Sequence, residues 1–106
     1  MDLQEKLWDL INERDDVMDD ILFCNDFLES LYFNTIQPEY YNEAIKFIIT
    51  RHNKDNDIIN SNDRREIIYF TRENIVRLES LKRALNARII RTKNRLNKRI
   101  KVIVEA

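Results

Sequence analysis

The sequence has no glycine, one proline and one cysteine in 106 residues. Tight β-turns usually need glycine at positive φ, so its absence argues against a protein built of hairpins. Long helices do not need glycine, and a glycine-rich phosphate-binding loop is excluded. The single cysteine, Cys24, cannot form an internal disulfide, which is typical of a reducing compartment. We therefore expect an all-α protein of the cytoplasm, or of the nucleus in a eukaryote, that is not secreted.

Residues that usually carry chemistry or targeting are also scarce. The only histidine, His52, has no second histidine and no cysteine near it, so neither a zinc site nor a catalytic triad can be assembled around it. We expect His52 to end a helix. No segment has the length of a transmembrane helix, and the N-terminus is acidic and amphipathic, unlike a secretory signal. We expect no catalytic residues, no metal site and no cofactor.

Apolar residues recur at helical intervals over residues 2–33. Positions 3, 7, 10, 14, 17, 21, 24, 28 and 31 alternate steps of four and three, and only Arg14 among them is not apolar. This is a heptad stripe over four repeats, with further apolar residues on its flanks that indicate more than one packing neighbour. A polar residue within such a stripe typically specifies helix register or oligomeric state, and we predict this role for Arg14.

Two further helices are predicted, over about 38–52 and about 62–100. Pro38 suits the first turn of the shorter helix, where its missing N–H costs nothing. Asp63 and Glu66 have the spacing of a capping box at the start of the longer one. Residues 53–62 are interpreted as a polar connection, with a helix there as the alternative. The tail, 101–106, has three open interpretations: a frayed end, a continued helix or a short strand.

The third segment has an apolar stripe with a different period. From Ile67 to Ile103 the positions follow steps of three, four and four, which is an eleven-residue repeat. Together the segments predict one helical domain, 1–106, with long first and third helices, a shorter second helix and coiled-coil-like packing. One short helix cannot cover two long ones, so we expect a homodimer, a partner protein, or both.

Charge is divided between the two halves of the chain. Residues 1–50 hold twelve acidic and three basic side chains, a net charge of −9, while residues 51–106 hold seven acidic and fifteen basic side chains, a net charge of +8. Such separation produces a strong local field around the basic end. We name as the basic segment the nine residues Lys82, Arg83, Arg88, Arg91, Lys93, Arg95, Lys98, Arg99 and Lys101, among which no acid intervenes.

The basic segment has several interpretations. It can pair with the acidic first helix, bind an acidic surface of a partner protein, or contact nucleic-acid phosphates through residues such as Arg88, Arg91, Arg95 and Arg99. More than half of its members are arginines, which favours carboxylate or phosphate recognition. Against nucleic acid, no aromatic residue follows Lys82, so no base-stacking platform exists there. A membrane surface is also compatible with a basic amphipathic pattern.

An acidic cluster lies within the first helix. Asp15, Asp16, Asp19 and Asp20 form two pairs of carboxylates spaced four apart, and adjacent carboxylates can bind a divalent cation. A metal-dependent hydrolase is therefore an alternative. No second acidic cluster of the required kind follows, so we interpret these residues as a solvated acidic face.

Aromatic residues gather near the first bend and at the start of the third helix. They serve either as core packing or, where exposed, as an interface for a partner protein. These residues are Tyr32, Phe33, Tyr40, Tyr41, Tyr69 and Phe70. The sequence thus favours a non-enzymatic adaptor, assembly or inhibitor protein acting through protein–protein contacts, of viral, phage or other mobile-element origin. A nucleic-acid-binding regulator is the alternative.

Overall fold

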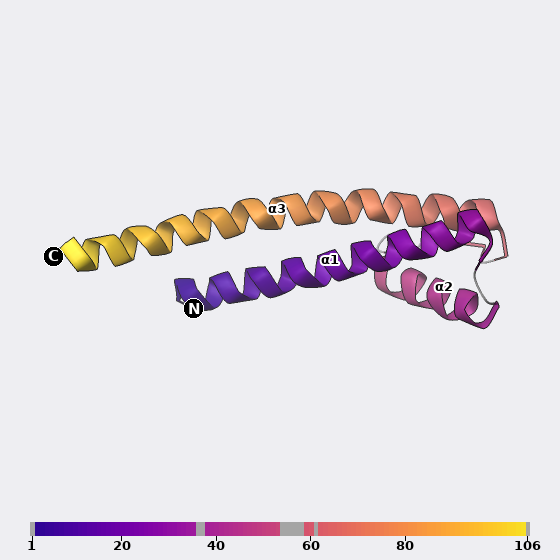
Figure 1. Ribbon diagram of the computed structural model, residues 1–106, viewed down its shortest axis with the longest axis horizontal. Coiled ribbons are helices and arrows are strands. Elements are labelled where there is room, and N and C mark those ends of the chain that lie inside the picture. The colour runs from indigo at the N-terminus through magenta and orange to yellow at the C-terminus, as the bar shows by residue number, and fades with distance from the viewer. Residues whose placement is uncertain (1, 36–37, 54–58, 61, 106) are drawn as a thin grey trace. The chain divides into compact units, whose positions relative to one another are not determined.

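The computed structural model has three helices (Figure 1), and it describes residues 2–35, 38–53, 59–60 and 62–105. Helix α1 spans Leu3–Phe33, α2 spans Pro38–His52 and α3 spans Arg64–Glu105. These described residues include no β-strand. The two long helices, α1 and α3, pack against each other, and α2 is shorter. The predicted all-α fold with long first and third helices is therefore confirmed.

Side-chain caps begin two of the helices. The Asp2 carboxylate accepts a hydrogen bond from the Glu5 N–H at 2.8 Å, immediately before α1. The Asp63 carboxylate accepts from the Glu66 N–H at 3.4 Å and from the Arg65 N–H at 3.0 Å, immediately before α3. Such bonds satisfy amide groups that have no partner within the helix. The start of α3 predicted from the Asp63 and Glu66 spacing is confirmed.

Helix α1 ends on a left-handed residue. Asn34 has a φ of 54°, and the Thr35 N–H donates to the Ser30 carbonyl at 3.1 Å. This six-to-one bond closes the last turn in the Schellman pattern, whose left-handed position usually holds glycine. Asparagine is the other residue that tolerates this conformation. A chain without glycine can therefore still end a helix sharply.

The sequence left two segments open, the tail at 101–106 and the connection at 53–62. Helix α3 continues to Glu105, so most of the tail is helical. Between α2 and α3, the described positions 53, 59, 60, 62 and 63 are not helical, in agreement with a polar connection. Residues 54–58 and 61 lie outside the described residues. None of the described helices has an apolar stretch long enough to cross a lipid bilayer.

The chain forms two compact units that share the long helices. Unit 1 combines residues 1–19 with 78–106, and unit 2 comprises residues 20–77. Unit 1 is thus a pair of helical segments, one from α1 and one from α3. Unit 2 contains all of α2 together with the end of α1 and the start of α3. The prediction of a single domain over the whole chain stays a prediction.

The core of unit 2 draws on three helices. Phe27 of α1, Ile48 of α2 and Ile67 of α3 each expose 2% or less of their surface. The rings of Phe27 and Tyr41 lie 6.1 Å apart between centroids, which joins α1 to α2. Burial of large apolar side chains such as these contributes about 1.5–3 kcal/mol each. In unit 1 the buried apolar residues are Leu10, Val17, Leu78, Leu85 and Ile89.

The predicted eleven-residue period of α3 accounts for six of its seven buried described residues, Ile67, Asn74, Leu78, Leu85, Ile89 and Thr92, and departs from the structure at three positions. Leu81 and Ile100, which it placed in the stripe, are 37% and 52% exposed. Thr71 is completely buried instead, because its hydroxyl donates to the Ile67 carbonyl at 2.8 Å and needs no partner elsewhere. The buried residues of α3 are Ile67, Thr71, Asn74, Leu78, Leu85, Ile89 and Thr92.

Candidate interaction surfaces

The basic segment lies on the α3 part of unit 1, and its charges face solvent. Every member is exposed except Lys82, which is half-buried and forms an ion pair with Glu79 at 3.3 Å. Among the described members of the segment from Lys82 to Arg99, no ion pair with an acidic residue of α1 is formed. The interpretation that the basic segment pairs with the acidic first helix of its own chain therefore has no support in these contacts.

Four arginines of the segment form a continuous row. Arg88, Arg91, Arg95 and Arg99 follow one another at steps of three, four and four residues, so each is a neighbour of the next on the helix surface. All four are exposed. The row is about 16 Å long at 1.5 Å per residue. Guanidinium groups in such a row can form bidentate bonds with carboxylates or phosphates.

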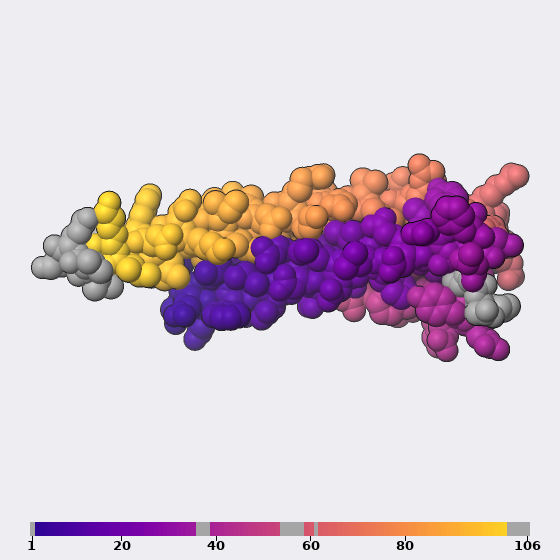
Figure 2. Space-filling model, viewed as in Figure 1, coloured from indigo at the N-terminus to yellow at the C-terminus, as the bar shows by residue number. Residues whose placement is uncertain are grey.

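The end of α3 also passes beyond the start of α1 within unit 1. Figure 2 shows the last described part of α3, in yellow, projecting past the indigo start of α1. Consistent with this, Lys98, Arg99, Ile100 and Lys101 are all exposed. The apolar Ile100 is therefore accessible between cations, so this end of the helix offers both charge and apolar contact.

Most of the predicted aromatic residues are exposed at the surface of unit 2. Tyr32, Phe33 and Tyr69 expose 56%, 70% and 66% of their surfaces. Tyr40 is also exposed. The exposure of several large aromatic side chains in one small unit is costly in water, and such residues are enriched at the centres of protein interfaces.

The other two aromatic residues face the interior. Tyr41 is half-buried against Phe27, and burial raises the pKa of its hydroxyl; the nearby Arg64 opposes this shift and Asp63 adds to it. Phe70 is half-buried and lines the small space between α2 and α3 together with Ile45. These two rings are therefore part of the packing between the helices of unit 2.

Arg14 connects the two helices of unit 1. Its side chain is 29% exposed, and its terminal nitrogen donates to the Asn86 amide oxygen at 3.4 Å. The same guanidinium contacts the Asp15 carboxylate at 3.3 Å. Arg14 therefore interrupts the apolar stripe where a polar residue of α3 can meet it. The contact joins one position of α1 to one position of α3, and the register role of Arg14 stays a prediction.

A buried polar cluster joins the three helices of unit 2. Asp20 of α1 binds Arg51 of α2 at 2.9 Å, and its side chain is only 13% exposed. The same carboxylate lies 3.7 Å from Nε2 of His52, which is 5% exposed. On the other side of the ring, Arg77 of α3 lies 3.2 Å from His52 Nδ1. Arg77 also donates to the Asn74 amide oxygen at 3.0 Å.

The geometry of this cluster determines the state of the imidazole. A guanidinium can only donate, so His52 Nδ1 accepts from Arg77 and the ring proton resides on Nε2, which faces Asp20. A doubly protonated ring would place an N–H against Arg77. The His52 ring therefore lies between the Asp20 carboxylate and the Arg77 guanidinium, and the cluster joins the end of α2 to both long helices.

Sequence reasoning identified the helix end at His52 but missed this cluster. The prediction that α2 ends at His52 is confirmed. The acidic cluster was interpreted as solvated, which agrees with the exposure of Asp15, Asp16 and Asp19 but is wrong for Asp20. The only local signal was Asn74, a polar residue within the apolar stripe. The other partners come from distant parts of the sequence.

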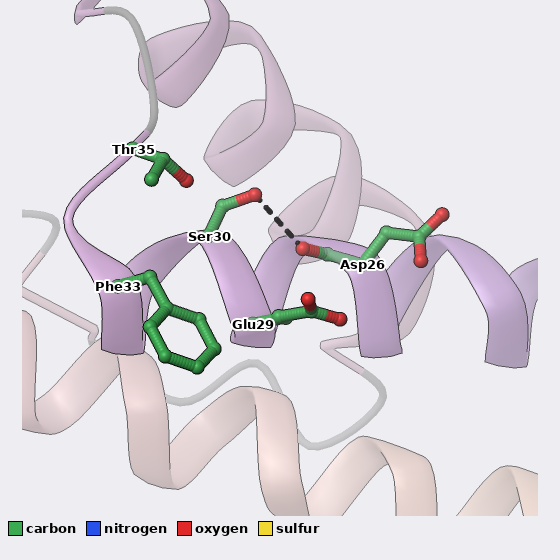
Figure 3. Close-up of a pocket in the computed structure, with 5 residues that line it drawn as sticks. All are labelled: Asp26, Glu29, Ser30, Phe33 and Thr35. Atoms are coloured by element: carbon green, nitrogen blue, oxygen red, sulfur yellow. Dashed lines mark hydrogen bonds between the residues drawn. The ribbon is translucent and has the colours of Figure 1, made fainter.

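An open hollow of about 450 Å³ lies beside the end of α1 (Figure 3). It is lined by Asp26, Glu29, Ser30, Phe33 and Thr35. The Ser30 hydroxyl donates to the Asp26 backbone carbonyl at 2.9 Å, so it is engaged with the helix backbone. The two carboxylates and the Phe33 ring suit contact with a basic or apolar side chain. Across the described residues, no group of three or more His, Cys, Asp or Glu side chains is placed to hold a metal ion.

Comparison of the chain with protein-family models, with curated proteins and with solved structures finds no match.

Proposed function

We propose that this protein is a non-enzymatic adaptor, assembly factor or inhibitor that acts through protein–protein contacts. The observation that carries the proposal is the exposure of Tyr32, Phe33 and Tyr69 in unit 2, each by more than half. Rigid aromatic side chains bury much area at a small entropic cost, which makes them frequent hot spots of binding. The acid-lined hollow beside Phe33 adds a place for a partner's basic side chain.

The test is affinity capture with matched variants of the full chain. Phe33→Ser with Tyr69→Ser removes two exposed rings, whereas Val76→Ser removes an apolar side chain of the same unit that is equally exposed, at 64%. A partner retained by the wild type and by Val76→Ser but lost from the double variant supports the proposal. Equal retention by all three proteins contradicts it, because the aromatic side chains then contribute nothing specific.

A second candidate function is nucleic-acid binding by the arginine row of α3. It is favoured by the exposure of Arg88, Arg91, Arg95 and Arg99 and by the absence of ion pairs between these residues and other described residues. Fluorescence anisotropy with labelled duplex DNA and RNA from about 50 mM to about 200 mM salt tests it. Binding that weakens with salt, and less steeply in Arg91→Gln with Arg95→Gln, supports this function. No binding at the lowest salt removes it.

A further inference from the structure

Unit 1 consists of two helical segments, so each segment has one neighbour within the unit. The contact between Arg14 and Asn86 fixes which residues lie level on these antiparallel segments (Figure 1). One turn away in each direction, Ile11 of α1 lies within one residue of the level of Ile90 of α3, and Met18 of α1 is level with Lys82. These positions border the same side of the helix pair as the Arg14–Asn86 contact.

That side carries an uncovered apolar face. Trp8, three residues before Ile11, is 60% exposed, and Met18 is 43% exposed. Ile90 is 58% exposed, while Ile11 is half-buried. Trp8 and Ile11 are three residues apart, so they are neighbours on the surface of α1. Met18, seven residues after Ile11, lies two turns further along the same side. We call Trp8, Ile11, Met18 and Ile90 the Trp8 face.

The charges beside the Trp8 face have opposite signs on the two helices. Asp15 and Asp19 flank it on α1, because Asp15 follows Ile11 by four residues and Asp19 follows Asp15 by four. On α3 it is flanked by Arg83, seven residues before Ile90, and by Lys93, three residues after it. All four charged side chains are exposed. Over longer stretches, residues 2–19 have seven acidic and two basic side chains, whereas the basic segment has nine cations.

We propose that the Trp8 face is the docking surface for a second copy of the chain, so that two copies of unit 1 form a four-helix bundle. In a bundle whose two-fold axis runs parallel to the helices, α1 of each copy lies beside α3 of the other. Asp15 and Asp19 then face Arg83 of the second copy, and Trp8 lies near Ile90 and Lys93. Every neighbouring pair of helices is antiparallel and opposite in charge.

Charge also excludes the other symmetric arrangement. A two-fold axis perpendicular to the helices within the interface would place α1 beside α1 and α3 beside α3. This would oppose two acidic helices, each with seven acids in residues 2–19, and two basic segments. Like-charge contact suppresses wrong pairings more effectively than attraction strengthens right ones. The parallel axis is therefore the one that the sequence and structure favour.

A charge-swap experiment on the full chain tests this arrangement. One variant carries Asp15→Lys and Asp19→Lys, and the other carries Arg83→Glu and Lys93→Glu. By sedimentation equilibrium, the wild type should have twice the mass of one chain, and each variant should self-associate about tenfold or more weakly. An equal mixture of the two variants should recover the double mass. In the mixed dimer, both contacts between α1 and α3 again join opposite charges.

Recovery on mixing also shows that both variants are folded, which circular dichroism checks independently. Arg88→Glu with Arg95→Glu makes the same charge change on the arginine row outside the Trp8 face, and it should leave self-association within about twofold of the wild type. A monomeric wild type overturns the proposal. So does a mixture that stays monomeric, or equal loss in the Arg88 and Arg95 variant. None of these results bears on the aromatic residues of unit 2, so the proposed function is tested separately.

Discussion

The single thiol should make this protein sensitive to alkaline pH. Cys24 is completely buried, and burial raises the pKa of its thiol from 9.0 to about 11, with Asp20 adding to the shift and Arg77 opposing it. In the unfolded chain the thiol ionises near 9.0, whereas in the folded chain it stays protonated until about 11. The stability that comes from the protonated thiol is therefore complete below pH 9.0 and is lost as the pH rises to about 11.

The size of the effect follows from the two pKa values. A shift of one pKa unit corresponds to about 1.4 kcal/mol, so a rise from 9.0 to about 11 amounts to about 3 kcal/mol in total. At about pH 10.5, roughly 2 kcal/mol of this should be lost. Small domains have about 5–15 kcal/mol of stability, so the loss should be readily measurable.

Urea unfolding, followed by circular dichroism, measures this loss when the wild type is compared with Cys24→Ala at about pH 7 and about pH 10.5. The alanine variant is less stable at neutral pH, by about 1 kcal/mol, because it leaves a small cavity. Between about pH 7 and about pH 10.5, the free energy of unfolding of Cys24→Ala should fall by about 2 kcal/mol less than that of the wild type. Other groups, including Tyr41, titrate in both proteins and cancel. An identical loss in both proteins would refute the reasoning.

Substitutions at three further positions test the core packing, the end of α1 and the polar cluster. Phe27→Ala should lower the free energy of unfolding by about 3–5 kcal/mol, because this fully buried ring fills the contact between α1 and α2; a loss below 1 kcal/mol in urea titration would contradict the described core. Asn34→Ala should lower the free energy of unfolding by about 1 kcal/mol, because alanine is strained at this positive φ and cannot accept the hydrogen bond from Arg64. In thermal unfolding, Asn34→Gly should lose much less stability than Asn34→Ala, because glycine adopts this φ without strain. Asp20→Asn should lower stability by about 1–3 kcal/mol, since Arg51 loses its buried counter-charge; an unchanged urea midpoint would show that the cluster is not formed.

Local chemistry explains why the sequence predicted the helices so closely. Pro38 and His52 bound α2 in both the prediction and the structure, because a proline at the start and a basic residue at the end act within one turn. The Asp63 cap likewise acts on amides two and three residues away. Signals of this kind need no knowledge of distant residues. The exposed charge of the arginine row was also predictable, because no acid lies within the segment.

Contacts between residues far apart in the sequence were harder to predict from the sequence pattern. Thr71 lies inside and Leu81 faces solvent, although hydrophobicity alone suggests the opposite. Thr71 lies with Phe27 of α1 and Ile48 of α2 around one small space, so the neighbouring helices decide its burial. The sequence pattern of one helix does not show which of its side chains the other helices cover.

By itself the sequence determined three helices, the ends of α1 and α2, the start of α3 and the separation of charge, since each depends on residues within a few positions of one another. Only the tertiary structure decided that His52 meets both Asp20 and Arg77 inside unit 2, and that Arg14 meets Asn86 in unit 1. The physical reason is that a buried polar side chain needs a hydrogen-bonding or ion-pair partner, and these partners come from other helices.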